Sequence, residues 1–292
     1  MSDLRQSMQY SNYLKSIEWK IETCLPAGRK STPVNIYCKY LFPIGWFVKI
    51  QHPSVLTDKI INFVESTYHP FQFSIEPLEN KQVNLLNKYN FKINKFPSLP
   101  SKTLIIYLNK SQDYLLKSFS QKTRYNIKLS KTKNIKIVES KNILDFTDFW
   151  RENFEKKRFF YLPAGMAFFS QQKNIIALSN AFGKNSHILL AKKDNEIIAS
   201  LFLLVNDKVM YYMYAASNDT GRNNFAPTLL TWNAILLAKK LKCHTFDFDG
   251  IYDERFPINS WLGFTKFKLG FTKTEINYPG RFVKTKSFFS IT

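Results

Sequence analysis

The spacing of apolar residues predicts alternating helices and strands in the first third of the chain. Val55, Ile60, Ile61 and Val64 recur at the spacing of an amphipathic helix over residues 55–67. The same patterns predict further helices and strands, at residues 10–21 and 79–89 for the helices and at 34–41, 46–50, 71–75, 91–96 and 103–108 for the strands. Because helices and strands alternate, we expect this part to form an α/β lobe.

A second lobe is predicted to begin at Ser111, which can cap a new helix. A basic helical region follows from Lys117, and then come a strand at 135–138, helices at 143–158 and 168–182, and strands at 187–192, 197–205 and 209–216. The last three strands form a meander, because only short turns separate them. A loop at 219–226, a helix at 227–240 and a strand at 244–248 complete the core order of the acetyltransferase-like (GNAT) fold.

The stretch of residues 244–271 carries the candidate chemistry. Its first strand runs into Asp249-Gly250, and lysines alternate with aromatic residues at 264–271. We expect this second segment to be a strand, on which Lys266 and Lys268 share a face. Since loops and strand ends commonly carry catalytic groups, Lys268 is predicted to be the main electrostatic group of an active site. The alternative is a surface lysine in a hairpin.

The formal charge of +20 favours partners that carry phosphate or an anionic membrane surface. The basic cluster between Lys117 and Lys133 is either a platform for RNA phosphates or a solvated helix face. A genome rich in A and T would also enrich lysine and asparagine without selection for binding. Lysine outnumbers arginine, which fits diffuse attraction better than bidentate reading of bases.

Cysteine usage and hydropathy indicate a cytoplasmic protein. Cys24, Cys38 and Cys243 show no metal-ligand spacing and no even pairing, so we expect a reducing compartment and no bound metal. The first residues lack the apolar core of a signal peptide, and no apolar run reaches the roughly 18–20 residues that span a bilayer. Peripheral contact with the inner face of an anionic membrane is compatible with the charge.

Five segments carry recognisable motifs in a fixed order: YLKSIEW at 13–19, FSIEP at 73–77, KTRYNI at 122–127, YYMYAAS at 211–217 with Ala226-Pro227, and DFDG at 247–250 with Gly263 and Phe267-Lys268. Together they resemble the motifs of the FemABX family, which builds the interpeptide bridges of bacterial peptidoglycan. The chain departs from the usual pattern at Lys15, where glutamine is common, and at Glu76, where aspartate is common.

The resemblance implies a mixed α/β fold of two tandem GNAT-like lobes. We expect an N-terminal lobe over residues 1–112, to which residues 280–292 return, and a C-terminal lobe over residues 113–279. It also implies transfer of an amino acid from aminoacyl-tRNA to an amine on the stem peptide of a UDP- or lipid-linked muropeptide. The family uses no metal and no coenzyme A, so no cofactor is expected.

The resemblance also implies roles for particular residues. Lys268 takes the position of the catalytic lysine, with Phe267 beside it, and Glu76 that of a carboxylate near the acceptor amine. Lys20 and Arg158 are the nearest matches to the cations that bind the precursor's phosphates. The other substrate-binding candidates lie in the motifs: Arg124, Tyr125, Tyr212, Tyr214, Asp247, Asp249 and Gly250. A tyrosine-rich strand also suits a core, and Asp247 also suits a structural cap or salt bridge.

Two other classes of protein compete with this interpretation. A GNAT N-acetyltransferase would share the fold and would use acetyl-CoA, whose pyrophosphate binds backbone amides of a glycine-rich loop. The corresponding loop at 217–226 has one glycine, Gly221, and no Gly-x-Gly. A non-catalytic RNA-binding protein would bind tRNA with strong salt dependence, whether or not the tRNA is aminoacylated. A third alternative keeps the chemistry and changes the acceptor, for example to a protein N-terminus.

Overall fold

The chain folds into two compact units, each built on its own sheet. The computed structural model describes residues 3–25, 32–158 and 164–286, without the side chains of 154–158 and 164–170. The first unit comprises Met1–Lys102, Tyr252–Asn259 and Asn277–Thr292, and the second unit comprises Thr103–Ile251 and Ser260–Ile276. The chain therefore crosses between the units several times, and each unit contains segments that are distant in sequence.

The first unit has a six-stranded sheet in the order β1-β2-β3-β4-β13-β5. Its strands are β1 Lys20–Cys24, β2 Val34–Leu41, β3 Gly45–Gln51, β4 Gln72–Glu76, β5 Lys92–Asn94 and β13 Arg281–Thr285. The strands β3 and β4 run parallel, and β13 inserts antiparallel between β4 and β5. The end of the chain thus completes a sheet that its beginning starts.

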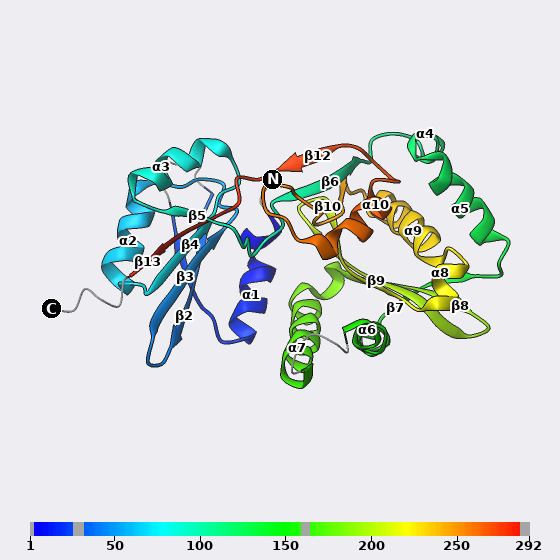
Figure 1. Ribbon diagram of the computed structural model, residues 1–292, viewed down its shortest axis with the longest axis horizontal. Helices are drawn as coiled ribbons and strands as arrows, with labels where there is room; N and C mark the ends of the chain where they lie inside the picture. The colour runs from blue at the N-terminus through cyan, green and yellow to red at the C-terminus, as the bar shows by residue number, and fades with distance from the viewer. Residues whose placement is uncertain (1–2, 26–31, 159–163, 287–292) are drawn as a thin grey trace. The chain divides into compact units, whose positions relative to one another are not determined.

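The two faces of the first sheet differ in chemistry. Val48, Ile50, Phe73, Ile75 and Phe282 belong to one buried apolar cluster with residues of helix α2 (Asp58–Tyr68). Since successive strand residues point to opposite faces, the alternate positions of these strands face the other way. Figure 1 shows α2 on one side of this sheet, and α1 (Met8–Ser16) on the other.

The second unit has a seven-stranded sheet in the order β12-β6-β11-β10-β9-β8-β7. Its strands are β6 Lys102–Tyr107, β7 Lys136–Ser140, β8 Ser186–Lys193, β9 Glu196–Asn206, β10 Val209–Ser217, β11 Thr245–Asp247 and β12 Glu275–Asn277. The meander β8-β9-β10 is antiparallel, whereas β10 and β11 are parallel. This mixed sheet follows from the helical crossover that joins β10 to β11.

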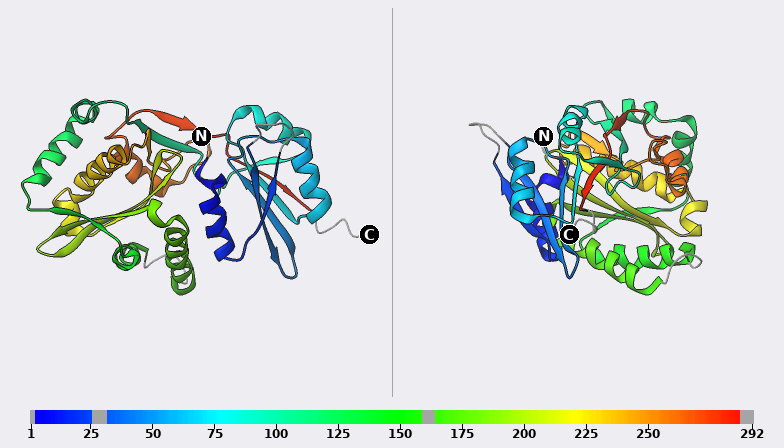
Figure 2. Two further views of the ribbon diagram at one scale, coloured as in Figure 1. Left: turned by 180° about the vertical axis from the view of Figure 1, so that it is seen from behind. Right: turned by 60° about the vertical axis from the view of Figure 1, so that its left-hand side comes forward.

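Helices cover both faces of the second sheet, as Figures 1 and 2 show. The helix α9 (Ala226–Lys240) packs against the meander through a buried side that includes Leu230 and Ile235. The others are α4 Gln112–Ser118, α5 Gln121–Lys131, α6 Ile143–Arg158, α7 Ala164–Phe182, α8 Asp219–Asn223 and α10 Leu262–Lys268. In the described ranges no helix is both long and apolar enough to cross a membrane.

The predicted mixed α/β class and the GNAT-like element order are confirmed. The meander, the long helix after it and the next strand all form at the predicted places, and Ser111 caps α4 by accepting from the amide of Tyr114. In the opening segment the predicted helix is too long, because it ends at Ser16 and Lys20 starts a strand. The predicted loop at 219–226 contains the short helix α8.

The predicted strand at 264–271 is wrong. Residues Leu262–Lys268 form the helix α10, in which Lys266 is exposed and Lys268 is buried. Phe264, Phe267 and Phe271 recur at three- and four-residue intervals, which is the helical period and outweighs the short alternation of lysine with phenylalanine. Two positions apart on a helix, Lys266 and Lys268 point to different sides rather than sharing a face.

Substituting Gly221 tests how tightly α8 is packed on the sheet. A Cβ at this position would lie 2.0 Å from the carbonyl oxygen of Ile198 in β9, so Gly221→Ala must displace the backbone. We expect a loss of about 1–3 kcal/mol in the free energy of unfolding, measured by urea denaturation. Gly263→Ala is the control, because a Cβ in that helical position meets no atom within 4 Å. Equal stability of the two variants would contradict this packing.

Candidate active site

Lys268 is the centre of the candidate site in the second unit. It ends α10, its side chain is only 7% exposed, and its Nζ donates hydrogen bonds of 2.6 Å to the carbonyl oxygens of Phe248 and Gly250. An ammonium has three N–H groups. Two are committed to these carbonyls, so one N–H is left to meet a further acceptor.

The turn after β11 shapes this pair of carbonyls. Asp249 has a φ of 58° and Gly250 a φ of 139°, and these values fold the chain back immediately after the strand. Glycine suits the second value because it has no Cβ to clash. The carboxylate of Asp247 holds the start of the turn, since it accepts from the amide of Asp249 at 2.8 Å and from the hydroxyl of Thr103 at 2.5 Å. The turn is thereby anchored to the neighbouring strand β6.

The surroundings of Lys268 lower its pKa, so the ammonium loses its proton more readily than an exposed lysine does. Burial lowers the pKa of Lys268 to about 8, although the charges of Asp249 and Asp247 act in the opposite direction. The strand ends at Asp247, the turn reorients Asp249, and both carboxylates influence the same ammonium.

Aromatic rings lie beside the ammonium. The Lys268 Nζ lies 4.7 Å from the ring centroid of Phe264 and 5.4 Å from that of Tyr212. Phe264 stands one helical turn before Lys268, and we missed its contact because we expected a strand. Phe267, the predicted neighbour, packs against Phe271 with ring centroids 5.3 Å apart. It supports the helix on the core side.

A β-bulge separates the two candidate tyrosines. The register of β10 against β9 shifts between Tyr212 and Tyr214, so the two side chains do not share the face that simple alternation predicts. Tyr212 is buried against Phe248, and burial raises its pKa to about 12. Tyr214 instead packs near Trp150 of α6 and Phe202. Of the two, Tyr212 is the one beside Lys268.

The candidate site lies where the parallel strands β10 and β11 stop pairing. The pairing of β10 with β11 ends at Tyr211 and Asp247, whereas β10 continues to Ser217. Lys268 therefore binds the chain just beyond the last paired residue of β11 and contacts the ring of the next residue of β10. In open α/β sheets, ligands commonly bind beyond the carboxyl ends of parallel strands.

Comparison with known proteins connects this site to a family. Residues 168–288, which include Lys268 and the turn it binds, match the model of the FemAB family. The resemblance to FemABX proteins that the motifs indicated is thus confirmed. No curated protein matches the chain in sequence.

Solved structures match the fold over nearly the whole chain. FemX is 14% identical with a TM-score of 0.78, covering 97% of this chain and 92% of its own. The C-terminal domain of a putative lysylphosphatidylglycerol synthetase from Agrobacterium fabrum is 10% identical with a TM-score of 0.59, covering 97% and 89%. A tandem GNAT protein from the clavulanic acid biosynthesis pathway is 8% identical with a TM-score of 0.54, covering 91% and 83%. These identities are low, so the likeness shows the fold, that of tandem GNAT-like lobes.

The FemAB match and the GNAT-like fold identify the chain as an acyltransferase with aminoacyltransferase-type function. The loop before α9 corresponds to the one that binds the pyrophosphate in coenzyme A enzymes, and three of its amides have partners within the chain. The amide of Gly221 donates to the Asn218 side chain at 2.8 Å, and those of Arg222 and Asn224 donate to the carbonyls of Asn218 and Thr220. These amides are already bonded, so they are not available to a pyrophosphate.

In the first unit, Glu76 is held by a structural network. Its carboxylate accepts from the amide and hydroxyl of Ser98 at 2.8 and 2.7 Å, from the amide of Leu99 at 2.7 Å and from the Gln51 side chain at 3.2 Å. Four donors fill the acceptor positions of one carboxylate, which fixes the loop at 98–99 to the end of β4. A catalytic role for Glu76 stays a prediction, and it would require Glu76 to release one of these bonds.

The two predicted phosphate-binding cations, Lys20 and Arg158, lie on β1 and at the end of α6. Lys20 forms an ion pair with Glu22 at 3.0 Å and lies 5.2 Å from the ring of Tyr68. Arg158 ends α6, and its side chain lies outside the described residues.

Two further candidates lie in the FemABX-like segment at 122–127. Arg124 donates to the carbonyls of Lys117 and Phe119 and so caps α4. The side chain of Tyr125 is 61% exposed.

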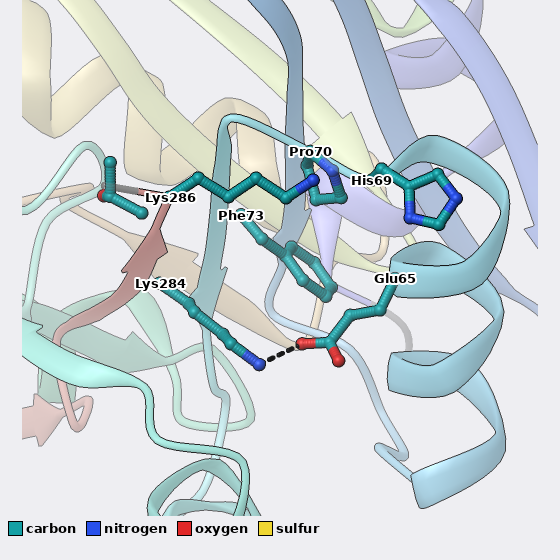
Figure 3. Close-up of a pocket in the computed structure, with 7 residues that line it drawn as sticks. Glu65, His69, Pro70, Phe73, Lys284 and Lys286 are labelled. Carbon is teal, nitrogen blue, oxygen red and sulfur yellow. Dashed lines mark hydrogen bonds and ion pairs between the residues drawn. The ribbon is translucent and has the colours of Figure 1, made fainter. Parts of the chain in front are cut away.

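A pocket of about 280 Å³ opens beside the start of β4 and the end of β13 in the first unit (Figure 3). Its lining residues are Glu65, His69, Pro70, Phe73, Lys284, Thr285 and Lys286. Lys284 donates to Glu65 at 2.6 Å, so a main positive charge of the pocket is already neutralised. The pocket contains none of the predicted site residues, and sequence reasoning gave no sign of it.

The lowered pKa of Lys268 predicts a pH-dependent contribution to stability. Folded protein releases this proton at about pH 8, whereas an unfolded lysine keeps it to about pH 10.4. Stability conferred by Lys268 therefore rises with pH across this window, by at most about 3 kcal/mol. We expect the difference in unfolding free energy between the wild type and Lys268→Met to grow in favour of the wild type from pH 8 to 10.

Urea denaturation at several pH values measures this difference. Lys266→Met, which removes an equal charge from the exposed side of the same helix, corrects for the change in net charge. A constant difference between wild type and Lys268→Met across the window would contradict the burial of the ammonium.

Proposed function

We propose that the protein transfers an amino acid from aminoacyl-tRNA to an amine of a peptidoglycan precursor, a UDP- or lipid-linked muropeptide. The observation that carries this proposal is the buried Lys268 ammonium, fixed on two backbone carbonyls with one N–H left over. The FemAB match supports the donor and acceptor classes in general terms. The bonded amides of the loop at 217–226 favour aminoacyl-tRNA over acetyl-CoA.

The reaction needs orientation and charge stabilisation more than a strong nucleophile. An aminoacyl ester is already activated, so a neutral amine can attack its carbonyl carbon and form a tetrahedral intermediate with a negative oxygen. The free N–H of Lys268 would donate to that oxygen. Collapse of the intermediate breaks the ester bond, forms the amide, and returns the ribose hydroxyl of the tRNA with the proton that the amine gave up.

Rigid placement makes this ammonium effective. The two carbonyl bonds hold the Nζ in position before substrate arrives, so no reorganisation is needed when charge develops. The apolar surroundings strengthen the interaction, because Phe264 and Tyr212 exclude water from the side of the amine. Asp247 and Asp249 keep the proton on the lysine near neutral pH by raising its pKa against the effect of burial.

Lys268→Met tests the catalytic role. We expect kcat to fall about 10²- to 10³-fold, since this is the usual cost of losing one oxyanion donor. Substrate would be a labelled aminoacyl-tRNA pool with a UDP-linked or lipid-linked muropeptide, and the product is identified by mass. Lys266→Met, exposed on the same helix, should retain activity. Transfer that occurs only with acetyl-CoA, or undiminished turnover by Lys268→Met, would refute the proposal.

A basic surface on α4 and α5 suits the tRNA. Residues 114–138 contain seven lysines or arginines and no acid. None of the seven forms an ion pair within the described part of the chain. Lys128, Lys131 and Lys133 are exposed, and the ring of Tyr125 is exposed near them on α5. Unpaired cations can displace counterions from a phosphate backbone, and an exposed aromatic ring can stack on an unpaired base.

Charge reversal tests this surface. Replacing Lys128, Lys131 and Lys133 together by glutamate should weaken tRNA binding by at least about tenfold at low salt and reduce its salt dependence. Lys59, Lys92 and Lys95 are exposed in the first unit, and their reversal to glutamate changes net charge equally. Filter binding with one purified tRNA measures both. Equal losses from the two triple variants would mean that only net charge matters.

A further inference from the structure

The first sheet carries a polar face that is largely buried. Lys49 is paired with Ser74, and Gln51 with Glu76, in the parallel register of β3 and β4. Their neighbours in sequence, including Val48 and Ile50, form the apolar cluster, so these four polar residues point to the opposite face. Gln51, Ser74 and Glu76 are each at most 5% exposed. Buried polar groups need partners, so each one has to be accounted for.

Arg281 joins the same face from β13. Phe282 pairs with Ile75 and belongs to the apolar cluster, so Arg281, one position earlier, points to the polar side near Glu76. Lys49 is in register with Ser74 and Ser74 with Val283, so Arg281, two positions before Val283, lies on the same face as Lys49. Three neighbouring strands thus contribute two cations and one carboxylate to one surface of the unit.

The carboxylate does not neutralise these cations through direct contact. The carboxylate of Glu76 accepts its hydrogen bonds from Ser98, Leu99 and Gln51. Its charge raises the pKa of Lys49, but burial and the charge of Arg281 outweigh it and lower that pKa to about 8. A lysine can relieve such a cost by losing its proton. An arginine cannot, because its guanidinium stays charged in proteins.

Both cations lack a hydrogen-bonding partner among the described residues. The Lys49 Nζ lies 4.3 Å from the ring centroid of Trp19 and 5.9 Å from that of Tyr37, and it makes no hydrogen bond or ion pair. The Arg281 Nε is fully buried and has no acceptor. Leaving a buried charged donor unpaired costs more than leaving a neutral one. An acceptor supplied by a ligand would remove this cost.

We propose that Lys49 and Arg281 form a binding site for an oxyanion, a phosphate or carboxylate group, on the polar face of the first sheet. Such a group would accept from the buried Arg281 Nε and pair with both charges, and the Trp19 ring would bound it on one side. The other described cations of this unit that lie in partly buried surroundings have partners. Lys284 pairs with Glu65 in the pocket of Figure 3, and Lys39 donates to the Ile17 carbonyl.

This site is independent of the proposed reaction. It involves neither Lys268 nor tRNA, and its occupation can be measured by binding alone. A phosphate and a carboxylate share the chemistry that the two cations recognise, so separate probes are needed. Pyrophosphate represents phosphate-bearing ligands, and succinate represents carboxylate-bearing ones.

Ligand-dependent melting of the full chain tests the site. We expect millimolar pyrophosphate or succinate to raise the Tm of the wild type, and to leave the Tm of Lys49→Met and Arg281→Met nearly unchanged. Lys59→Met is the matched control, because Lys59 is exposed on α2 and its loss removes the same charge. It should respond as the wild type does. The probe that gives the larger shift identifies the class of oxyanion.

The unliganded variants provide a second signature. Removing a half-buried cation that has no hydrogen-bond acceptor should leave the Tm equal to or above that of the wild type, whereas removing a structural contact should lower it. Crystals of the wild type grown with tungstate, a heavy oxyanion, give a measurement that needs no variant, and they should show anomalous density between Lys49 and Arg281. Equal Tm shifts in all four proteins, no shift with either probe, or no tungstate at this place would overturn the proposal.

Discussion

The second unit depends on how it accommodates one buried ammonium. Charge in an apolar interior is costly unless hydrogen bonds satisfy it, and Lys268 finds its acceptors in the carbonyls of Phe248 and Gly250. Both can point at one Nζ only because the chain folds back at Asp249 and Gly250. That turn needs a fixed origin, which the bond from Thr103 to Asp247 supplies. The strand order, the turn and the helix α10 are therefore linked through a single cation.

Periodic patterns predicted the elements well because burial on one face repeats along a helix or strand. The meander and α9 were predicted correctly, since their apolar positions extend over many residues. The short helix α10 was not, because seven residues give too few repeats to separate a period of two from one of 3.6. The bulge between Tyr212 and Tyr214 left no trace in the pattern either, since its cause is pairing with another strand.

The motifs located the site better than they described its contacts. They pointed to Lys268 and to the segment 247–250, and the structure brings these together. The partners of Lys268 are main-chain oxygens, whose position depends on φ and ψ and not on residue type. For Glu76 the motif marked a strand end, but its hydrogen-bonding partners lie 22 and 23 residues later and 25 residues earlier in the chain. Such distant contacts arise from tertiary packing, which no local pattern encodes.

Lys268 and the half-buried Lys49 differ in how the chain satisfies their charges, which is why we assign them different proposed roles. Lys268 is satisfied by the protein itself, so it is held in place before any ligand arrives and can act on charge that exists only during a reaction. Lys49 and Arg281 lack acceptors in the described chain, so they gain most from a charge that is present in the bound ground state. An interaction that is equally strong before and during the reaction improves binding and leaves kcat unchanged. On these two proposals, Lys268 of the second unit would act in the reaction, and the polar face of the first sheet would bind an anionic group.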